Sequence, residues 1–361
     1  MTAPLRLPVS VLTGFLGSGK TTLLSHLIRT PALARAAVVI NEFGAVGLDH
    51  ILVEKSSENT VLLDSGCLCC TVRGDLIDTL RTLFLRRTRG EIAEFDRVVI
   101  ETTGLADPAP ILHTLMSDPL LASRFRLDGV ITTIDGVLGA GQLDDHVESV
   151  KQAAVADRLV LTKTDLTTAE AIAALTARLR LLNPAAAIIT ADQGAVDAER
   201  LLDAGLYNPA TKSADVTRWL NAEAYHDDHE EHGHDDHGAG HHGHDVNRHD
   251  DRIRAFCLTF DQPLPWEGVV NAITNLIAMR GPDLLRIKGI LNVIDSDTPI
   301  VIHGVQHMFH PPAQLEAWPD DDRRSRLVFI TRDLDRSVIT AMFDMFGGLD
   351  AALPPPHARP Q

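Results

Sequence analysis

The 361-residue sequence lacks most features that mark secreted, membrane-spanning or nucleic-acid-binding proteins. It has only 4 cysteines, and three of them fall within four positions, which is too clustered for a disulfide framework. The N-terminus lacks the basic and apolar segments of a signal peptide, and no apolar run is long enough to cross a bilayer. We therefore expect a cytoplasmic protein. In such a reducing compartment, clustered thiols usually bind metals or carry out redox chemistry.

Positive charge is also scarce, since the formal net charge is −16. Half of that charge comes from residues 226–251, where nine histidines and nine acidic residues are accompanied by a single arginine. The rest of the chain is mildly acidic and has no basic patch. Such a surface suits neither nucleic acid nor an anionic membrane, so we expect neither as a partner.

A complete phosphate-binding motif is the strongest signal in the chain. The segment Gly14–Thr21 reads G-F-L-G-S-G-K-T and matches G-x-x-x-x-G-K-[ST] at every fixed position. An apolar strand at 9–13 precedes it and a helix at 22–28 follows, as such a loop requires. Backbone N–H groups would face the phosphates, Lys20 would reach the β- and γ-phosphates, and Thr21 would ligate Mg²⁺. The predicted nucleotide ligands here are Gly14, Gly17, Ser18, Gly19, Lys20, Thr21 and Thr22.

Two further strands end in polar motifs that suit a nucleotide site. The first ends in E-T-T-G, where Glu101 would act on Mg²⁺ or its water and the Gly104 N–H would sense the γ-phosphate. The second ends in T-K-T-D, formed by Thr162, Lys163 and Asp165 with one residue between the last two. It differs from the guanine-reading pattern N-K-x-D at Thr162. A carboxylate at Asp165 can accept two guanine N–H groups, so we expect GTP rather than ATP.

Cys67, Cys69 and Cys70 form a C-L-C-C cluster. Thiolates select Zn²⁺ or Cu(I), and Co²⁺ also accepts sulfur-rich tetrahedral sites. The alternatives are an inert buried trio and a redox sensor that uses the neighbouring thiols. Cys257 lies in a separate predicted strand and is expected to pack in a core.

Together, G-F-L-G-S-G-K-T, N-E-F-G (41–44), S-G-C-L-C-C (65–70), E-T-T-G and T-K-T-D resemble the CobW-type metallochaperone GTPases. The resemblance implies a GTPase that delivers a divalent metal, mostly zinc and in some members cobalt. It also implies that Glu42 joins Cys69 and Cys70 as a metal ligand with Cys67 close by, and that Asp49 faces Mg²⁺ and the γ-phosphate. Cobalt supply for cobalamin synthesis is an alternative role.

The stretch 41–47 contains two glycines and follows the apolar strand 37–40, so it could rearrange with nucleotide state. Because Glu42 lies in it, GTP and metal affinities would then be coupled, and each ligand would change the affinity of the other by the same factor. In hydrolysis, Lys20 and Mg²⁺ would hold the γ-phosphate while Asp49 or Glu101 orients water. No arginine finger is evident in the chain, so unaided turnover should be slow.

The histidine-rich tract is a second candidate metal site. Segments this polar bury no core, and neutral imidazoles bind Zn²⁺, Ni²⁺, Co²⁺ or Cu²⁺. A storage or buffering protein acting through this tract is the alternative to a chaperone. A solvated linker whose histidines are incidental is a further alternative. The predicted ligands are His226, His229, His232, His234, His237, His241, His242 and His244.

The order of predicted elements gives the fold class and the domains. Strands alternate with helices before the tract, which predicts an α/β P-loop NTPase domain with a mainly parallel sheet at 1–205. Residues 206–251 are the predicted linker, 252–350 a smaller α+β domain with a strand at 300–309, and 351–361 a tail. Three histidines near that strand (303, 307 and 310) are expected to be core or surface residues. Arg286 and Lys288 share one strand face, and we expect them to be solvated, with a phosphate or an acidic partner as the alternative. The client metalloprotein and a homodimer stay open.

Overall fold

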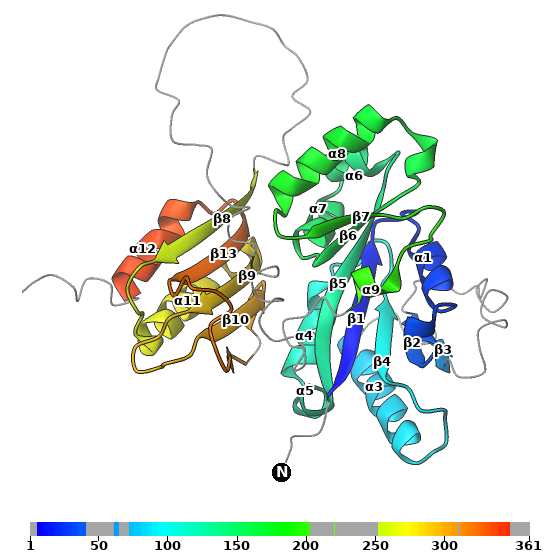
Figure 1. Cartoon of the computed structure of the whole chain (residues 1–361), viewed down its shortest axis with the longest axis horizontal. Helices are drawn as coiled ribbons and strands as arrows, with labels where there is room; N and C mark the ends of the chain where they lie inside the picture. Colours follow the sequence, from blue (N-terminus) through cyan, green and yellow to red (C-terminus); the bar gives the residue numbers. More distant parts are fainter. Residues whose placement is uncertain are drawn as a thin grey trace, which may run out of the picture.

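The computed structural model describes residues 6–40, 61–64, 72–202, 220, 252–309 and 311–346, with the backbone alone at 61–64 and 72–75. These residues form two domains, the first around a parallel sheet and the second around an antiparallel sheet (Figure 1). The predicted fold class is therefore confirmed. Among the described residues, no helix is long and apolar enough to span a bilayer.

The N-terminal sheet has seven strands in the order β3-β2-β4-β1-β5-β6-β7, and every pairing is parallel. Strand β1 is buried along nearly its whole length, as the continuous apolar runs of parallel sheets require. The strands are β1 (Leu7–Gly14), β2 (Ala36–Ile40), β3 (Val61–Asp64), β4 (Arg97–Glu101), β5 (Phe125–Asp135), β6 (Arg158–Thr162) and β7 (Ala187–Thr190).

Helices cover both faces of this sheet (Figure 1). One hydrophobic cluster joins the sheet to α1 and α9, and clusters on the opposite face join it to the remaining helices. The helices are α1 (Lys20–Leu27), α3 (Val72–Thr88), α4 (Ala109–Ser117), α5 (Pro119–Arg124), α6 (Gly139–Asp145), α7 (Val147–Ala154), α8 (Ala169–Leu182) and α9 (Ala198–Leu201). Because all seven strands are parallel, their carboxyl ends lie at one edge of the sheet, where ligands bind in such folds.

The C-terminal domain has an antiparallel sheet in the order β11-β10-β9-β13-β8, with β12 paired to β10. Helices α11 and α12 lie on the side of this sheet that faces away from the N-terminal domain (Figure 1). The elements are β8 (Ile253–Phe260), α11 (Trp266–Arg280), β9 (Leu284–Leu291), β10 (Ile300–Val305), β11 (Met308–Phe309), β12 (Ala313–Gln314), β13 (Ser325–Arg332) and α12 (Arg336–Phe346).

The single strand predicted at 300–309 is wrong, because the chain reverses there. Strand β10 ends at Val305 and returns antiparallel as β11, so that Val305 pairs with Met308. Gln306 starts the two-residue turn with a left-handed φ of 54°. Tight hairpins need this backbone conformation, which glycine and asparagine usually supply. Neither residue is present in the turn, which consists of Gln306 and His307, so no residue pattern predicts a reversal there.

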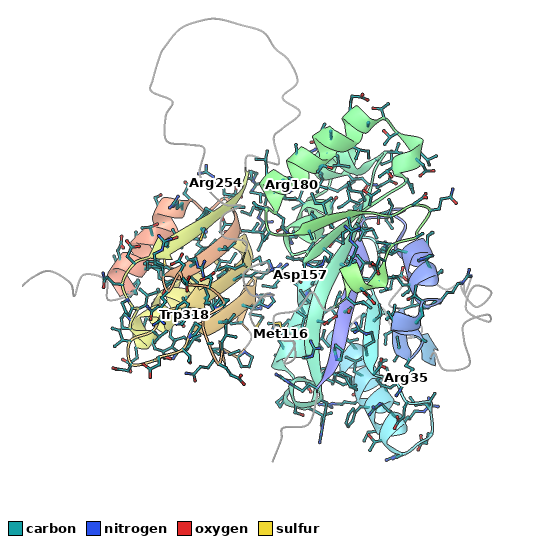
Figure 2. All side chains as sticks on the ribbon, viewed as in Figure 1. Arg35, Met116, Asp157, Arg180, Arg254 and Trp318 are labelled. Carbon is teal, nitrogen blue, oxygen red and sulfur yellow. The ribbon has the colours of Figure 1, made fainter. Side chains whose placement is uncertain are left out.

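Charged side chains meet in the interface between the domains. Asp157, which precedes β6, accepts hydrogen bonds from Arg286 and Lys288 of β9, and the Lys288 Nζ–Oδ1 distance is 3.0 Å. All three side chains are at most 5 % exposed. The expectation that the two cations are solvated is wrong, since they have an acidic partner in the same chain. Figure 2 shows Asp157 and Met116 on the side of the N-terminal domain that faces the C-terminal sheet.

Burial and pairing act in opposite directions on these groups. Burial alone would raise the pKa of Asp157, but the Arg286 and Lys288 charges hold it well below its usual range. Burial and the neighbouring Arg286 charge lower the pKa of Lys288 to about 7, although the Asp157 carboxylate works against this shift. The interface therefore contains a lysine that titrates near neutral pH.

Candidate nucleotide site

A cavity of about 280 Å³ opens at the carboxyl edge of the parallel sheet. It lies where β1 and β4, which are parallel neighbours, both end. The phosphate-binding loop between β1 and α1 forms one wall, and the loop that follows β4 forms the other. The lining residues are Leu16, Gly17, Gly19, Lys20, Thr21, Thr22, Ile40, Glu101, Thr102, Thr103 and Gly104.

The glycines of the phosphate-binding loop have backbone conformations that other residues rarely adopt. Gly14, Gly17 and Gly19 have φ values of 141°, 71° and 89°. A Cβ atom on Gly14 would also lie 2.2 Å from the Thr133 hydroxyl oxygen, which leaves no room for a side chain. The three predicted glycines are thus required by the path of the loop, which ends at the first residue of α1.

Two side chains of α1 bring charge and oxygen ligands to the cavity. The Lys20 ammonium donates to the Gly14 and Phe15 carbonyl oxygens at 3.0 and 3.1 Å. The Thr21 hydroxyl donates to the Glu101 carboxylate at 2.8 Å. A hydroxyl and a carboxylate at the mouth of a phosphate site form the oxygen-donor set that Mg²⁺ prefers. The residues present therefore fit this ion.

Ser18 and Thr162 anchor the phosphate-binding loop to the neighbouring strands β5 and β6, and both side chains are buried. The Ser18 hydroxyl lies 2.6 Å from that of Thr133 on β5. The Thr162 hydroxyl donates to the Ser18 carbonyl oxygen at 2.8 Å. The threonine that replaces asparagine in T-K-T-D consequently ties the end of β6 to the phosphate-binding loop.

The expected base-recognition residues follow β6 on the same edge of the sheet. Lys163 has a left-handed φ of 55°, and its ammonium donates to Asp135 at 2.6 Å. Burial would raise the pKa of Asp135, but Lys163 and the N–H groups of Leu138 and Val137 together hold it below its usual value. Asp165 is exposed, as a carboxylate that binds a base would need to be.

The loop after β4 is held by side chains of α7 that the sequence motifs did not reveal. The buried Gln152 side chain of α7 donates to the Gly104 and Ala106 carbonyl oxygens at 3.2 and 2.9 Å. The Lys151 ammonium donates to Asp107 at 2.9 Å. These partners are more than forty positions apart in the sequence, and a lone glutamine on a helix gives no motif. Only the packing of α7 against the loop brings them together.

The predicted cargo-metal ligands Glu42, Cys67, Cys69 and Cys70 lie outside the described residues, as do Asp49 and the histidine tract. Within the described ranges, no three His, Cys, Asp or Glu side chains are grouped closely enough to hold a metal ion. His303 is buried on β10 and His307 is exposed in the hairpin turn, as expected for core and surface histidines. His310 is outside the described residues. Burial raises the pKa of the Cys257 thiol on β8, which agrees with a packing role.

Two family descriptions match the chain in the order of its domains. The CobW/HypB/UreG nucleotide-binding domain matches residues 8–190, and the cobalamin synthesis protein cobW C-terminal domain matches residues 253–346. The first match covers the nucleotide cavity and the second covers most of the antiparallel domain.

Named relatives match along nearly the whole chain. Zinc chaperone YjiA from Escherichia coli is 31% identical over 335 residues, which cover 93% of this chain and 97% of the relative. Zinc chaperone CobW from Pseudomonas aeruginosa is 31% identical over 369 residues, with 92% and 90% covered. The crystal structure of Zn(II)-bound YjiA GTPase from E. coli superposes with a TM-score of 0.67 at 30% identity, covering 95% of this chain and 99% of that one. A cavity built on a phosphate-binding loop, two matching domains and full-length relatives agree, and the chain belongs to the CobW/HypB/UreG family.

Proposed function

We propose that this protein is a GTP-hydrolysing metallochaperone that takes up zinc and passes it to a client metalloprotein under nucleotide control. The observation that carries the proposal is the cavity in which Lys20, Thr21 and Glu101 converge beside the phosphate-binding loop. Full-length relatives are named zinc chaperones, and this supports zinc as the cargo.

The chain is a P-loop GTPase, and its own residues divide the work of hydrolysis. The backbone of the phosphate-binding loop and Lys20 hold the phosphates, and Thr21 and Glu101 would hold Mg²⁺, which neutralises charge on the transferred phosphoryl group. Gly104 would donate its N–H toward the γ-phosphate. Asp165 would accept the guanine N–H groups, with Lys163 along the base. Positioning and charge stabilisation are the main contributions that such enzymes make.

Strand pairing supports coupling between this cavity and the cargo site. Strands β2 and β3 are parallel neighbours, with Ile40 in register with Asp64. Ile40 lines the nucleotide cavity. Strand β2 ends at Ile40, two positions before Glu42, and β3 ends at Asp64, three positions before Cys67. We propose that these four residues bind the zinc and that residues 206–251, with their histidines, collect metal between the domains.

The test is a comparison of Zn²⁺ affinity in the presence of non-hydrolysable GTP and of GDP, measured on the full chain. We expect the two affinities to differ by about fivefold or more, because linkage between coupled sites typically has this size. Replacing Cys67, Cys69 and Cys70 by serine should remove the nucleotide-sensitive zinc site. Cys257→Ser is the matched control, since Cys257 lies on β8 of the other domain. Equal affinities in the two nucleotide states would overturn the proposal.

A further inference from the structure

The loop that follows β4 connects the nucleotide cavity to the C-terminal domain within a few residues. At its start, Gly104 lies directly against the phosphate-binding loop, where a Cβ atom would be 2.8 Å from the Leu16 backbone nitrogen. At its end, two positions before α4, Asp107 accepts a hydrogen bond from the Ala109 N–H at 3.0 Å. A shift of Gly104 relative to the phosphates would therefore change the position of Asp107.

Asp107 also contacts the C-terminal domain. Its Oδ2 atom accepts from Lys151 at 2.9 Å and from the Gln306 side-chain amide at 3.2 Å. Gln306 is in the two-residue turn between β10 and β11. The Asp107 side chain is 26% exposed, so water can solvate its charge when the side chain moves.

The hairpin that carries Gln306 is firmly docked on the N-terminal domain. Val305 is 3% exposed and belongs to the same hydrophobic cluster as Leu112 and Met116 of α4. The His307 ring lies 5.5 Å from the His113 ring, also on α4. Docking of this kind keeps the Gln306 amide in place, so that it can act as a fixed reference for Asp107.

Helix α7 holds the same loop from the other side. Gln152 is fully buried, and its amide donates to the Gly104 and Ala106 carbonyl oxygens. The preceding residue, Lys151, contacts Asp107. At the start of α7, His146 stacks on Phe15 of the phosphate-binding loop at 4.5 Å. The loop is thus held between a helix that contacts the phosphate-binding loop and a hairpin that belongs to the other domain.

We propose that Gln306 and Asp107 are positioning residues through which the C-terminal domain sets the geometry of the Gly104 loop for GTP hydrolysis. This inference rests on the GTPase activity in the proposed function and is independent of the cargo metal. Contacts that differ between two loop positions shift the balance between them. A hairpin that favours the position seen here would raise the rate of the chemical step.

The test uses the full chain and measures GTP turnover with Mg²⁺ and without added zinc. Gln306→Met removes the amide and keeps the length of the side chain. We expect kcat to fall about fivefold or more, a size typical of coupled sites, while KM for GTP stays near its original value. Gln314→Met is the matched control, because this glutamine of β12 bonds only within the C-terminal domain, to Ser296 and Thr298. The control should keep kcat, and both variants should unfold at similar urea concentrations.

A second variant separates positioning from simple loss of structure. Asp107→Asn keeps the acceptor for the Ala109 N–H but removes the charge, so kcat should fall as in Gln306→Met. The double variant should lose little more than either single one, since residues in one contact are not additive. Unchanged kcat in Gln306→Met, fully additive losses, or losses that follow a lower unfolding midpoint would each overturn the proposal. A wild-type chain without GTP turnover would remove both this inference and the proposed function. A chain that turns over GTP but shows no nucleotide-sensitive zinc affinity would remove the chaperone function alone.

Discussion

The nucleotide cavity and the domain interface each contain a lysine and a carboxylate, and they use these charges differently. At the cavity, Lys20 and Glu101 contact backbone carbonyls and a hydroxyl beside about 280 Å³ of open space. At the interface, Asp157 is enclosed by Arg286 and Lys288, and its charge is satisfied within the protein. Both regions are buried, so burial of charge alone does not identify a ligand site. The two regions differ in the open space that lies beside the charges at the nucleotide cavity.

The largest effect should come from breaking the charge balance at the interface. Asp157→Asn leaves Arg286 and Lys288 buried together without their anion. Removing one partner of a buried ion pair typically costs about 3–5 kcal/mol, and we expect a loss of unfolding free energy of this size in urea denaturation. Glu94→Gln is the control, because Glu94 is 75% exposed beside Arg35, and such pairs contribute about 0–1 kcal/mol. Similar losses in the two variants would contradict the enclosed character of the interface.

Lys20→Ala should show the opposite pattern at the cavity, with lost activity and retained stability. Removing a group that stabilises transition-state charge typically lowers kcat by about 10²–10³. Phosphate release measures the effect, and urea unfolding should change little. Arg35 lies on the surface of the same domain (Figure 2). Arg35→Ala should therefore keep full turnover. Turnover that survives in Lys20→Ala would mean that the cavity is not the site of hydrolysis.

Gly104→Ala probes the close contact between the two walls of the cavity. The added Cβ would lie 2.8 Å from the backbone of Leu16, so the loop must move away from the phosphates. We expect kcat to fall about tenfold, because small misplacements at a reacting centre are costly. Gly141→Ala is the matched control, since no atom lies within 4 Å of a Cβ at Gly141. A fall of similar size in the control would point to a general glycine effect.

The most gradual effect concerns pH and Lys288, whose pKa is about 7 in the folded protein against an ordinary value of 10.5 in an unfolded chain. Below pH 7 both states carry the proton, and the folded state bears the full cost of the buried charge. Between pH 7 and 10.5 only the unfolded state keeps it, so stability should rise with pH by up to about 1.4 kcal/mol per unit. Urea unfolding from pH 6 to 9 measures this slope. Lys288→Met should flatten the slope, and equal slopes in the two proteins would contradict the shifted pKa.

The sequence predicted the regions whose chemistry depends on residues close together in the chain. The phosphate-binding loop, the strand that ends at Glu101 and the strand that ends in T-K-T-D were all predicted, because local patterns require them. The contacts of Asp107 with Lys151 and Gln306 join residues far apart in the chain, so no motif records them. The same is true of Asp157 and β9, where an alternating strand pattern suggested solvated cations. Glu42 and the cysteine cluster stay predictions.

The hairpin turn at Gln306 has a consequence for how this protein can be divided. Because Val305 completes a hydrophobic cluster of the N-terminal domain, a fragment that ends before β10 would expose the apolar side chains of α4 to water. Such a truncated protein should aggregate or bind other apolar surfaces. For the same reason, chimaeras between members of the family should exchange the hairpin together with α4, since the two elements have complementary packing surfaces.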